Sequence, residues 1–187
     1  MSLKEIFNEI PTIETKRIIL RKIQDQDAMA LYKYYNNENV YKYLDWNGPK
    51  SIEDALRIIK IWNRGFEEGL IIRLAIAEKT TNQIIGTIFL CNFEGKRAEV
   101  GYELSEDYWN KGIMSEALKE VLNLGFNQLG LTRIQAFTCQ ENIPSRNLLK
   151  KFHFREEGYL RQYECHTVSG ICKDMYIYAL LKEDFIY

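Results

Sequence analysis

RAEVGYELSEDYWNKGIMSEALKEVL, residues 97–122, contains a strand, a short polar loop and a helix in direct succession. Residues 97–104 alternate between polar and apolar side chains, which predicts a strand. From residue 113 apolar side chains recur at helical spacing, and the pattern predicts a helix to about residue 129. Between them, Asn110-Lys111-Gly112 is too polar and too flexible for either element. We therefore expect a loop that delivers the chain from a strand to an open helix N-terminus.

The start of this helix has the chemistry of an anion site. The first N–H groups of a helix lack intrahelical partners and carry a partial positive charge. Gly112 would let the backbone approach a ligand closely, and Lys111 would add a full charge. The predicted ligand is a phosphate group, most simply a diphosphate, although a glycine at a helix start is also ordinary loop chemistry.

The rest of the chain supplies a sheet around this stretch. Alternating or continuous apolar runs predict further strands at 17–21, 71–78, 84–90, 133–139, 158–164 and 174–181. Helical spacing and capping residues predict further helices at 25–35, 51–69 and 143–152. The order is β-α-α-β-β-β-α-β-α-β-β, an α+β fold with a mixed, mostly antiparallel central sheet flanked by helices. The helix at 113–129 should make strands 97–104 and 133–139 parallel neighbours.

Composition limits the class of protein. The 187 residues are 46% hydrophobic and 27% charged, which is globular usage, and without repeats or linkers we expect a single domain over 1–187. The net charge of −1 speaks against nucleic-acid or anionic membrane partners. No apolar run is long enough to span a membrane, and residues 1–11 lack a signal-peptide core, so a cytoplasmic location is expected.

The cysteines and histidines suggest no special chemistry. Four cysteines (Cys91, Cys139, Cys165 and Cys172) form no CxxC pair, and two histidines do not complete an obvious zinc site. We expect reduced thiols in the core or strands, and no metal.

Two segments together resemble a known family. They are AEVGYELSEDYWNKGIMSEAL (98–118) and RIQAFTCQENIPSRNLLKKFHF (133–154), and they are similar to the acetyl-CoA-binding core of the GNAT N-acetyltransferases. The closer likeness is to the Rim-type branch, which acetylates the N-termini of ribosomal proteins and carries GY-x-L, Y-W-G-K-G-[YI]-M-[TS]-E-A and N-x-x-S motifs. In weaker form the resemblance covers residues 15–185.

The resemblance implies a fold, a co-substrate and a set of residues. The loop 109–115 would wrap the pyrophosphate of coenzyme A, and the pantetheine arm would lie between two splayed strands. Asn142 would bond the arm's amide or the acyl end, with Ser145 near the sulfur. The implied cofactor-binding residues are Glu103, Leu104, Trp109, Asn110, Lys111, Gly112, Ile113, Met114, Ser115, Asn142 and Ser145.

Three positions depart from the family pattern. Asn110 replaces the first glycine of the loop, and asparagine tolerates the left-handed backbone conformation. Met114 replaces the usual glycine or alanine, as is frequent in the Rim-type branch. His153 stands where the helix end usually takes glycine, and we interpret it as a left-handed cap residue followed by Phe154, and not as a catalytic base.

Glu99 and Ser145 are the catalytic candidates that the resemblance implies. Glu99 could accept the proton of the attacking amine directly or through a water, although it could equally be a solvated strand residue paired with Arg97. Many GNAT enzymes carry a tyrosine seven positions after the asparagine, but here that position is Leu149. Ser145 could donate to the departing sulfur, or it could merely cap the helix.

The acceptor is the least determined element. The expected activity transfers an acetyl group from acetyl-CoA to a primary amine in a ternary complex, with a protein N-terminal α-amine of the ribosomal-protein type favoured. A small amine such as a polyamine or aminoglycoside, or a catalytically idle acyl-CoA-binding module, remains an alternative. The tyrosine-rich segment 32–46 lies where the family builds one wall of the acceptor cleft. The pattern allows a monomer or a homodimer.

Overall fold

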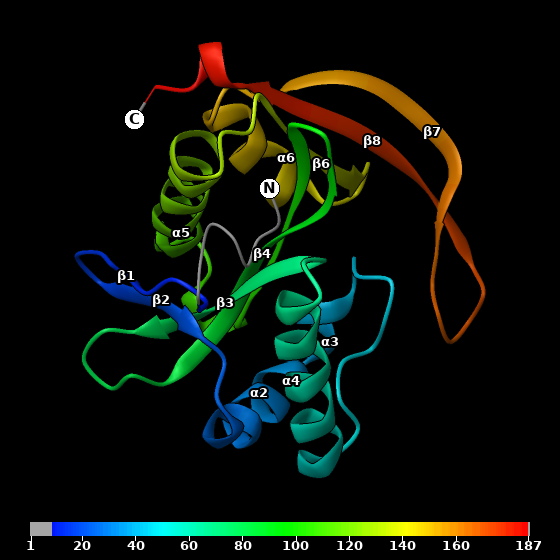
Figure 1. Cartoon of the computed structure of the whole chain (residues 1–187). Coiled ribbons are helices and arrows are strands. Elements are labelled where there is room, and N and C mark those ends of the chain that lie inside the picture. The colour runs from blue at the N-terminus through cyan, green and yellow to red at the C-terminus, as the bar shows by residue number, and fades with distance from the viewer. Residues whose placement is uncertain (1–8, 187) are drawn as a thin grey trace.

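The computed structural model describes residues 9–186 and contains one eight-stranded sheet in the order β1-β2-β3-β4-β5-β6-β8-β7 (Figure 1). The strands are β1 (Ile13–Glu14), β2 (Ile18–Lys22), β3 (Ile71–Glu78), β4 (Ile84–Glu94), β5 (Arg97–Leu104), β6 (Arg133–Cys139), β7 (Arg155–Cys165) and β8 (Cys172–Leu181). All neighbouring pairs are antiparallel except β5 and β6, which are parallel. The expected α+β, mostly antiparallel fold and the parallel neighbours are confirmed.

Helices cover both faces of this sheet. They are α2 (Ala28–Tyr35), α3 (Glu38–Tyr41), α4 (Ile52–Glu67), α5 (Ile113–Asn123) and α6 (Ile143–Lys151). Figure 1 shows α5 and α6 on one side of the sheet and α2, α3 and α4 on the other. The alternation of side chains along β3 explains the division, because Leu74 and Ile76 pack in the cluster under α5 and α6 while Ala75 packs under α2 and α4.

Several element bounds differ from the sequence prediction. The two-residue β1 and the one-turn α3 were not predicted, since both are too short to show a period. The helix expected to run to 129 is α-helical only to Asn123 and continues as a π-helical turn, Leu124–Gln128. β4 runs past residue 90 to Glu94, and β7 begins at Arg155, not at 158.

The parallel pair β5 and β6 is joined at one end only. Among the described residues the two strands pair at Arg97–Arg133, Ala98–Ile134 and Glu99–Gln135, and not beyond. β6 nevertheless stays paired with β8 along its whole length, to Cys139. From Val100 onward, therefore, β5 and β6 diverge and leave a gap within the sheet.

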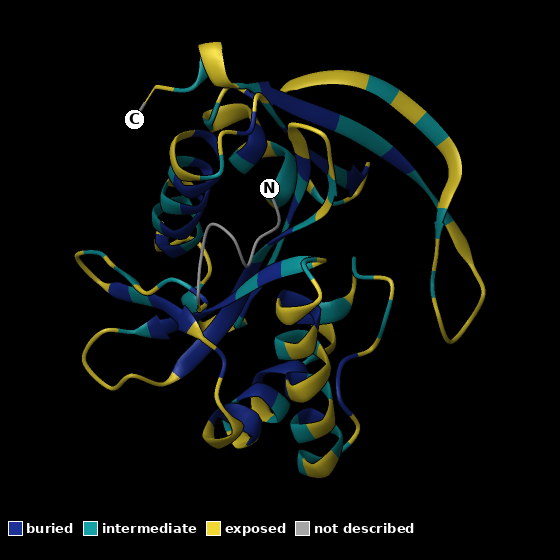
Figure 2. Cartoon of the chain, viewed as in Figure 1, coloured by how far each residue is buried: buried dark blue, intermediate teal, exposed yellow. Residues whose placement is uncertain are grey.

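The hairpin of β7 and β8 corrects the expectation for two cysteines. Cys165 and Cys172 are opposite each other in the antiparallel register and form a disulfide, so they are not reduced thiols. The sequence did not reveal this pairing because it depends on the hairpin register. Cys91 and the buried Cys139 are free thiols, as expected. Figure 2 shows that β7 is largely exposed along this hairpin.

Candidate active site

The helix N-terminus predicted from residues 97–122 is open. Gly112 precedes α5 in the left-handed conformation with φ of 75°, and Asn110 is also left-handed with φ of 58°. The N–H of Glu116 bonds the carbonyl of Gly112 at 3.1 Å, which closes the first helical turn. The N–H groups between them have no acceptor within the helix and point beyond its end, so an anion can bind here.

Contacts from distant segments fix the loop that leads to this helix. The indole Nε1 of Trp109 donates to the carbonyl of Leu104 at 2.7 Å, which folds the loop back on the end of β5. Arg17 donates from Nη1 to the carbonyl of Lys111 at 2.7 Å and from Nε to the Glu116 carboxylate at 2.6 Å. Burial alone would raise the pKa of Glu116, but hydrogen bonds from Thr15 and Arg17 outweigh it and hold the pKa below its usual value.

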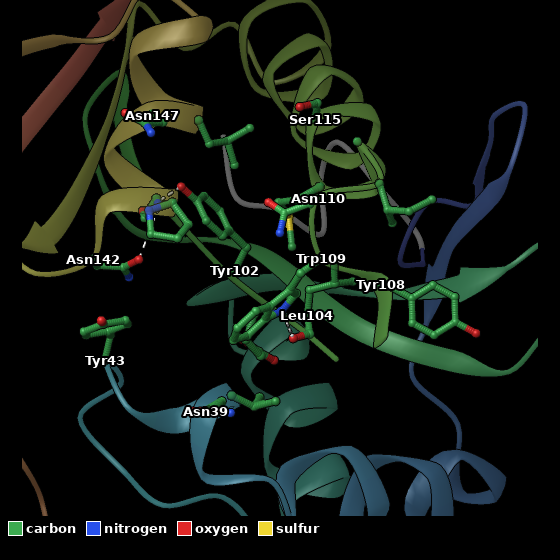
Figure 3. Close-up of a pocket in the computed structure, with 18 of the residues that line it drawn as sticks. Asn39, Tyr43, Tyr102, Leu104, Tyr108, Trp109, Asn110, Ser115, Asn142 and Asn147 are labelled. Atoms are coloured by element: carbon green, nitrogen blue, oxygen red, sulfur yellow. Dashed lines mark hydrogen bonds between the residues drawn. The ribbon is translucent and has the colours of Figure 1, made fainter. Parts of the chain in front are cut away.

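A cleft of about 390 Å³ runs from this helix end toward α6 (Figure 3). Ten of the eleven predicted cofactor-binding residues line it: Glu103, Leu104, Trp109, Asn110, Gly112, Ile113, Met114, Ser115, Asn142 and Ser145. The cleft lies beside the stretch of β5 that diverges from β6. Residues far apart in sequence are thus brought together as a single elongated site.

Two lysines lie near the helix start, and only one of them lines the cleft. Lys111 does not line the cleft, and its ammonium lies 5.6 Å from the centre of the Tyr108 ring. Lys151 at the end of α6 lines the cleft instead and donates to the Ser115 hydroxyl at 3.2 Å. Sequence reasoning missed Lys151 because its place depends on how α6 packs against α5.

At the other end of the cleft, Asn142 and Ser145 stand together at the start of α6. The Asn142 side chain accepts from the N–H of Ser145 at 3.2 Å and so caps α6. The Ser145 hydroxyl lies 2.9 Å from the hydroxyl of Tyr102 on β5. Burial raises the pKa of Tyr102 to about 12, which keeps this phenol protonated. The sequence did not single out Tyr102, which sits among the apolar positions of its strand.

A second, smaller cavity of about 150 Å³ adjoins the cleft, and we call it the side cavity. Tyr102, Asn142 and Ser145 line both spaces. Glu99 lines only the side cavity and accepts a hydrogen bond from the Asn92 side chain at 2.9 Å. Burial raises the pKa of the Glu99 carboxyl, against the Asn92 bond and the Arg97 charge, which lower it. The two catalytic candidates therefore face one space.

Glu103 lines both spaces but is held by other groups. Its carboxylate accepts from the Thr87 hydroxyl and lies 3.6 Å from the Arg73 guanidinium. Arg73 in turn lies between the rings of Trp62 and Phe89, at 4.3 and 3.8 Å from its Cζ. The acid is thus part of a buried ion pair beneath the site.

The structure also bears on the expectations for His153 and for the tyrosine-rich segment. His153 is left-handed, with φ of 63°, and the N–H of Phe154 returns to the Leu149 carbonyl at 3.1 Å, so the cap prediction is confirmed. Of the tyrosine-rich segment, Tyr43 lines both the cleft and the side cavity, whereas Tyr34 and Tyr35 are buried under α4. Across residues 9–186 no cluster of metal-binding side chains occurs, and no helix there is long and apolar enough to cross a membrane.

Known proteins resemble this chain in sequence and in fold. Residues 17–155 match the family model described as the acetyltransferase (GNAT) domain. The uncharacterised N-acetyltransferase YoaA of Bacillus subtilis (strain 168) is 38% identical over 174 residues, covering 92% of this chain and 97% of that relative. The ribosomal protein uS5-alanine N-acetyltransferase of Escherichia coli (strain K12) is 25% identical over 184 residues, 92% of each chain. A solved GNAT-family acetyltransferase from Bacillus anthracis superimposes with a TM-score of 0.80 at 29% identity, over 92% of this chain and 99% of that one.

Proposed function

The chain belongs to the GNAT acetyltransferases and is an N-acetyltransferase, and we propose that it transfers the acetyl group of acetyl-CoA to a primary amine by direct attack in a ternary complex. The observation that carries this proposal is the junction of two spaces. The cleft begins at an open helix N-terminus, the side cavity holds Glu99, and Tyr102 and Ser145 line both. Acetyl-CoA can therefore occupy the cleft while the amine occupies the side cavity, and the two can meet at these hydroxyls.

The cleft suits coenzyme A in charge and in shape. N–H groups at the start of α5, together with Asn110 and Ser115, would hold the diphosphate, and Lys151 would add a positive charge. The gap between β5 and β6 offers backbone groups of Val100 to Leu104 to the amides of the pantetheine arm. Bound there, acetyl-CoA supplies an activated acyl thioester, as GNAT enzymes require.

Glu99 is the proposed base. The amine must be neutral before its nitrogen attacks the thioester carbonyl carbon, so an incoming ammonium first loses one proton to solvent. As the new C–N bond forms and the C–S bond breaks, the nitrogen loses a second proton to Glu99, directly or through a water. A carboxyl whose pKa is raised by burial holds a proton better than an exposed glutamate, which suits this role.

Ser145 and Tyr102 would stabilise the departing sulfur by a hydrogen bond. Their hydroxyls share one hydrogen bond, so one of the two protons stays free to point into the cleft. That proton can be donated in a hydrogen bond to the sulfur as negative charge develops there. The thiolate then takes a proton from solvent to leave as the free thiol, and Glu99 returns its proton to solvent. An ammonium and acetyl-CoA thus yield an amide, a thiol and one released proton.

A protein N-terminal α-amine is the favoured acceptor. Its pKa is about 7.7–8.0 against about 10.4 for a lysine side chain, so deprotonation at neutral pH costs roughly 3–4 kcal/mol less. A modest base such as Glu99 is sufficient for that difference. The Escherichia coli relative, by its name, acetylates an alanine of a ribosomal protein. Acetylation of a small amine is the second candidate, and the small volume of the side cavity, about 150 Å³, is the observation that supports it.

Thiol release from acetyl-CoA tests the proposal. Purified protein should release thiol from acetyl-CoA in the presence of at least one amine from a panel of N-terminal peptides, polyamines and aminoglycosides. Glu99→Gln should lower kcat/KM about 10²–10⁴-fold, because it removes a general base, and should leave the calorimetric Kd for coenzyme A unchanged. Coenzyme A binding without turnover by any amine would identify an idle acyl-CoA-binding module, and absent binding would refute the site.

A further inference from the structure

The side cavity has a strongly one-sided charge. Four of its lining residues are acidic, and none is a lysine or an arginine. The acids are Asp45, Glu99, Glu103 and Glu164. They come from three separate parts of the chain, namely the loop after α3, strand β5 and the hairpin of β7 and β8, which we call the outer hairpin. A single ammonium awaiting acetylation does not require so much negative charge.

Within the described chain, two of these four carboxylates accept no hydrogen bond and form no ion pair. Glu99 is bonded by Asn92, and Glu103 is paired with Arg73. No hydrogen bond or ion pair reaches the carboxylates of Asp45 and Glu164 from any residue in the described range 9–186. Burial raises the pKa of Glu164, the charges of Asp45 and Glu99 raise it further, and the charge of Lys173 lowers it only in part, so these acids repel one another across the cavity. Such repulsion favours a cationic ligand.

A second observation in the same cavity also indicates a missing ligand group. Thr138 on β6 lines the cavity and is only 3% exposed, and its hydroxyl has no hydrogen-bond partner within the described chain. Buried hydroxyls are nearly always bonded, so a polar ligand atom is expected there. The aromatic residues Tyr43, Phe89 and Phe137 line the same space.

Asp45 and Glu164 lie on two segments that contact each other, the loop after α3 and the outer hairpin. The backbone N–H and the hydroxyl of Thr167 both donate to the carbonyl of Asp45, at 2.7 and 2.9 Å. The Lys173 ammonium, opposite Glu164 in the register, donates to the Lys42 carbonyl at 3.0 Å. These bonds fix the backbone that carries Asp45 and join the loop to the hairpin that carries Glu164; the side chain of Asp45 is exposed and that of Glu164 is partly buried.

We propose that the acceptor carries a second cationic group, and that Glu164 and Asp45 bind this group while Glu99 takes the proton from the reacting amine. This inference rests on the proposed acetyl transfer and specifies its substrate class. Two sources share the chemistry: a protein N-terminus followed closely by lysine or arginine, and a free aliphatic diamine. In either source the second charge lies a few bonds beyond the amine that is acetylated.

Matched pairs of acceptors test this class. One arm compares the peptide Ala-Lys-Ala-Ala with Ala-Gln-Ala-Ala, and the other compares 1,4-diaminobutane with n-butylamine, each by thiol release from acetyl-CoA at neutral pH. The dication of at least one pair should exceed its monocation roughly tenfold in kcat/KM, mainly through a lower KM. The pair that shows the preference identifies the source.

Variants then assign the effect to the two acids. Glu164→Gln, and separately Asp45→Asn, should each reduce the preference for the dication severalfold, whereas Glu99→Gln should lower kcat for both members of a pair. Glu183→Gln removes the same charge from an exposed site remote from the side cavity and should change nothing. Equal turnover of dication and monocation by the unmodified protein overturns the inference and leaves acetyl transfer standing. No thiol release with any acceptor refutes both.

Discussion

Gly112 and Asn110 set the backbone conformation on which the cleft depends. Both are left-handed, and in this conformation the N–H groups that follow are presented at the mouth of α5. A side-chain carbon built on Gly112 meets only Arg17 Nη2, at 3.5 Å, so space is not the constraint. The requirement is conformational, which is why glycine and asparagine occur here.

Gly112→Ala should therefore weaken coenzyme A binding through backbone strain. A left-handed alanine costs about 1 kcal/mol, and the loop either bears this strain or turns its N–H groups away. We expect a lower free energy of unfolding and a Kd for coenzyme A raised about fivefold by calorimetry. Gly130→Ala is the matched control, because Gly130 is also left-handed with open space around it but lies outside the cleft. Equal loss of binding in both variants would disprove a local role for Gly112.

Substitution of Asn92 should change the pKa of Glu99, the proposed base. Its amide donates to the Glu99 carboxylate and so favours the charged form, which lowers the pKa of Glu99. Asn92→Gly keeps the left-handed backbone found at Asn92 but removes the donor. The pKa of Glu99 should then rise further, measured by carbon-13 NMR titration of the carboxyl groups, and activity should begin to fall at a higher pH as acid is added.

The same titration of Asn82→Gly provides the reference. Asn82 is another left-handed asparagine, but its side chain accepts from Arg21 and does not contact Glu99. An unchanged pKa of Glu99 in Asn92→Gly would show that the hydrogen bond does not control the base.

At this scale, local signals in the sequence were sufficient for some residues and insufficient for others. The left-handed Gly112 and His153 and the cap Asn142 follow from preferences within a few positions of the chain. The contact of Tyr102 with Ser145 joins a strand to a helix 43 residues away. No local pattern encodes such a contact, because it depends on where α6 packs against β5.

Among the elements, strands β3, β4 and β5 hold an ion pair beneath the site. The side chains of Arg73 and Glu103 are 12% and 4% exposed, and two aromatic rings enclose the guanidinium. Both charges are therefore largely withdrawn from water, and each depends on the other. Such a pair fixes the relative position of the three strands more than it adds net stability.

Breaking this pair from one side should be costly. Arg73→Met or Glu103→Gln should each lower the free energy of unfolding by about 3–5 kcal/mol in urea denaturation, because one buried charge loses its partner. The double variant should lose less than the sum of the two single losses. Asp184→Asn, which breaks the exposed contact with Arg155, should cost less than about 1 kcal/mol. Additive losses from Arg73 and Glu103 would contradict their coupling.

Element prediction followed the length and periodicity of each segment. Strands β3, β5, β6 and helix α4 have clear periods and were found with nearly correct bounds. β1 and α3 are too short to show a period, and the π-helical turn after Asn123 keeps the apolar spacing of a helix while changing its hydrogen bonds. The divergence of β5 from β6 followed from the family resemblance and not from any residue pattern.

At the scale of the whole molecule, the outer hairpin reaches across to the loop after α3. Bonds from Thr167 to Asp45 and from His166 to Asn47, at 2.7–2.9 Å, join its tip to that loop. The disulfide between Cys165 and Cys172 closes the hairpin next to Glu164. One wall of the side cavity is therefore stabilised by a covalent bond distant from the cleft.

Alkylation should report this disulfide. Denatured without reductant, the protein should take two iodoacetamide groups, on Cys91 and Cys139, and four after reduction, measured by intact mass. In the native protein Cys91 should react slowly, because burial raises the pKa of its thiol to about 12. The paired substitution of Cys165 and Cys172 by serine should lower the free energy of unfolding by roughly 2.5 kcal/mol, the entropy of a loop of about eight residues. Four labels without reductant would refute the bond.

The separation of β5 from β6 leaves a gap in the protein's sheet that the proposed co-substrate would fill. A pantetheine arm bound there would act as a ninth strand, so adding acetyl-CoA should increase the amide-exchange protection of both flanking strands. Binding of acetyl-CoA and folding stability would then be linked, because the ligand binds only the folded protein. A shortage of acetyl-CoA would leave this protein easier to unfold as well as inactive.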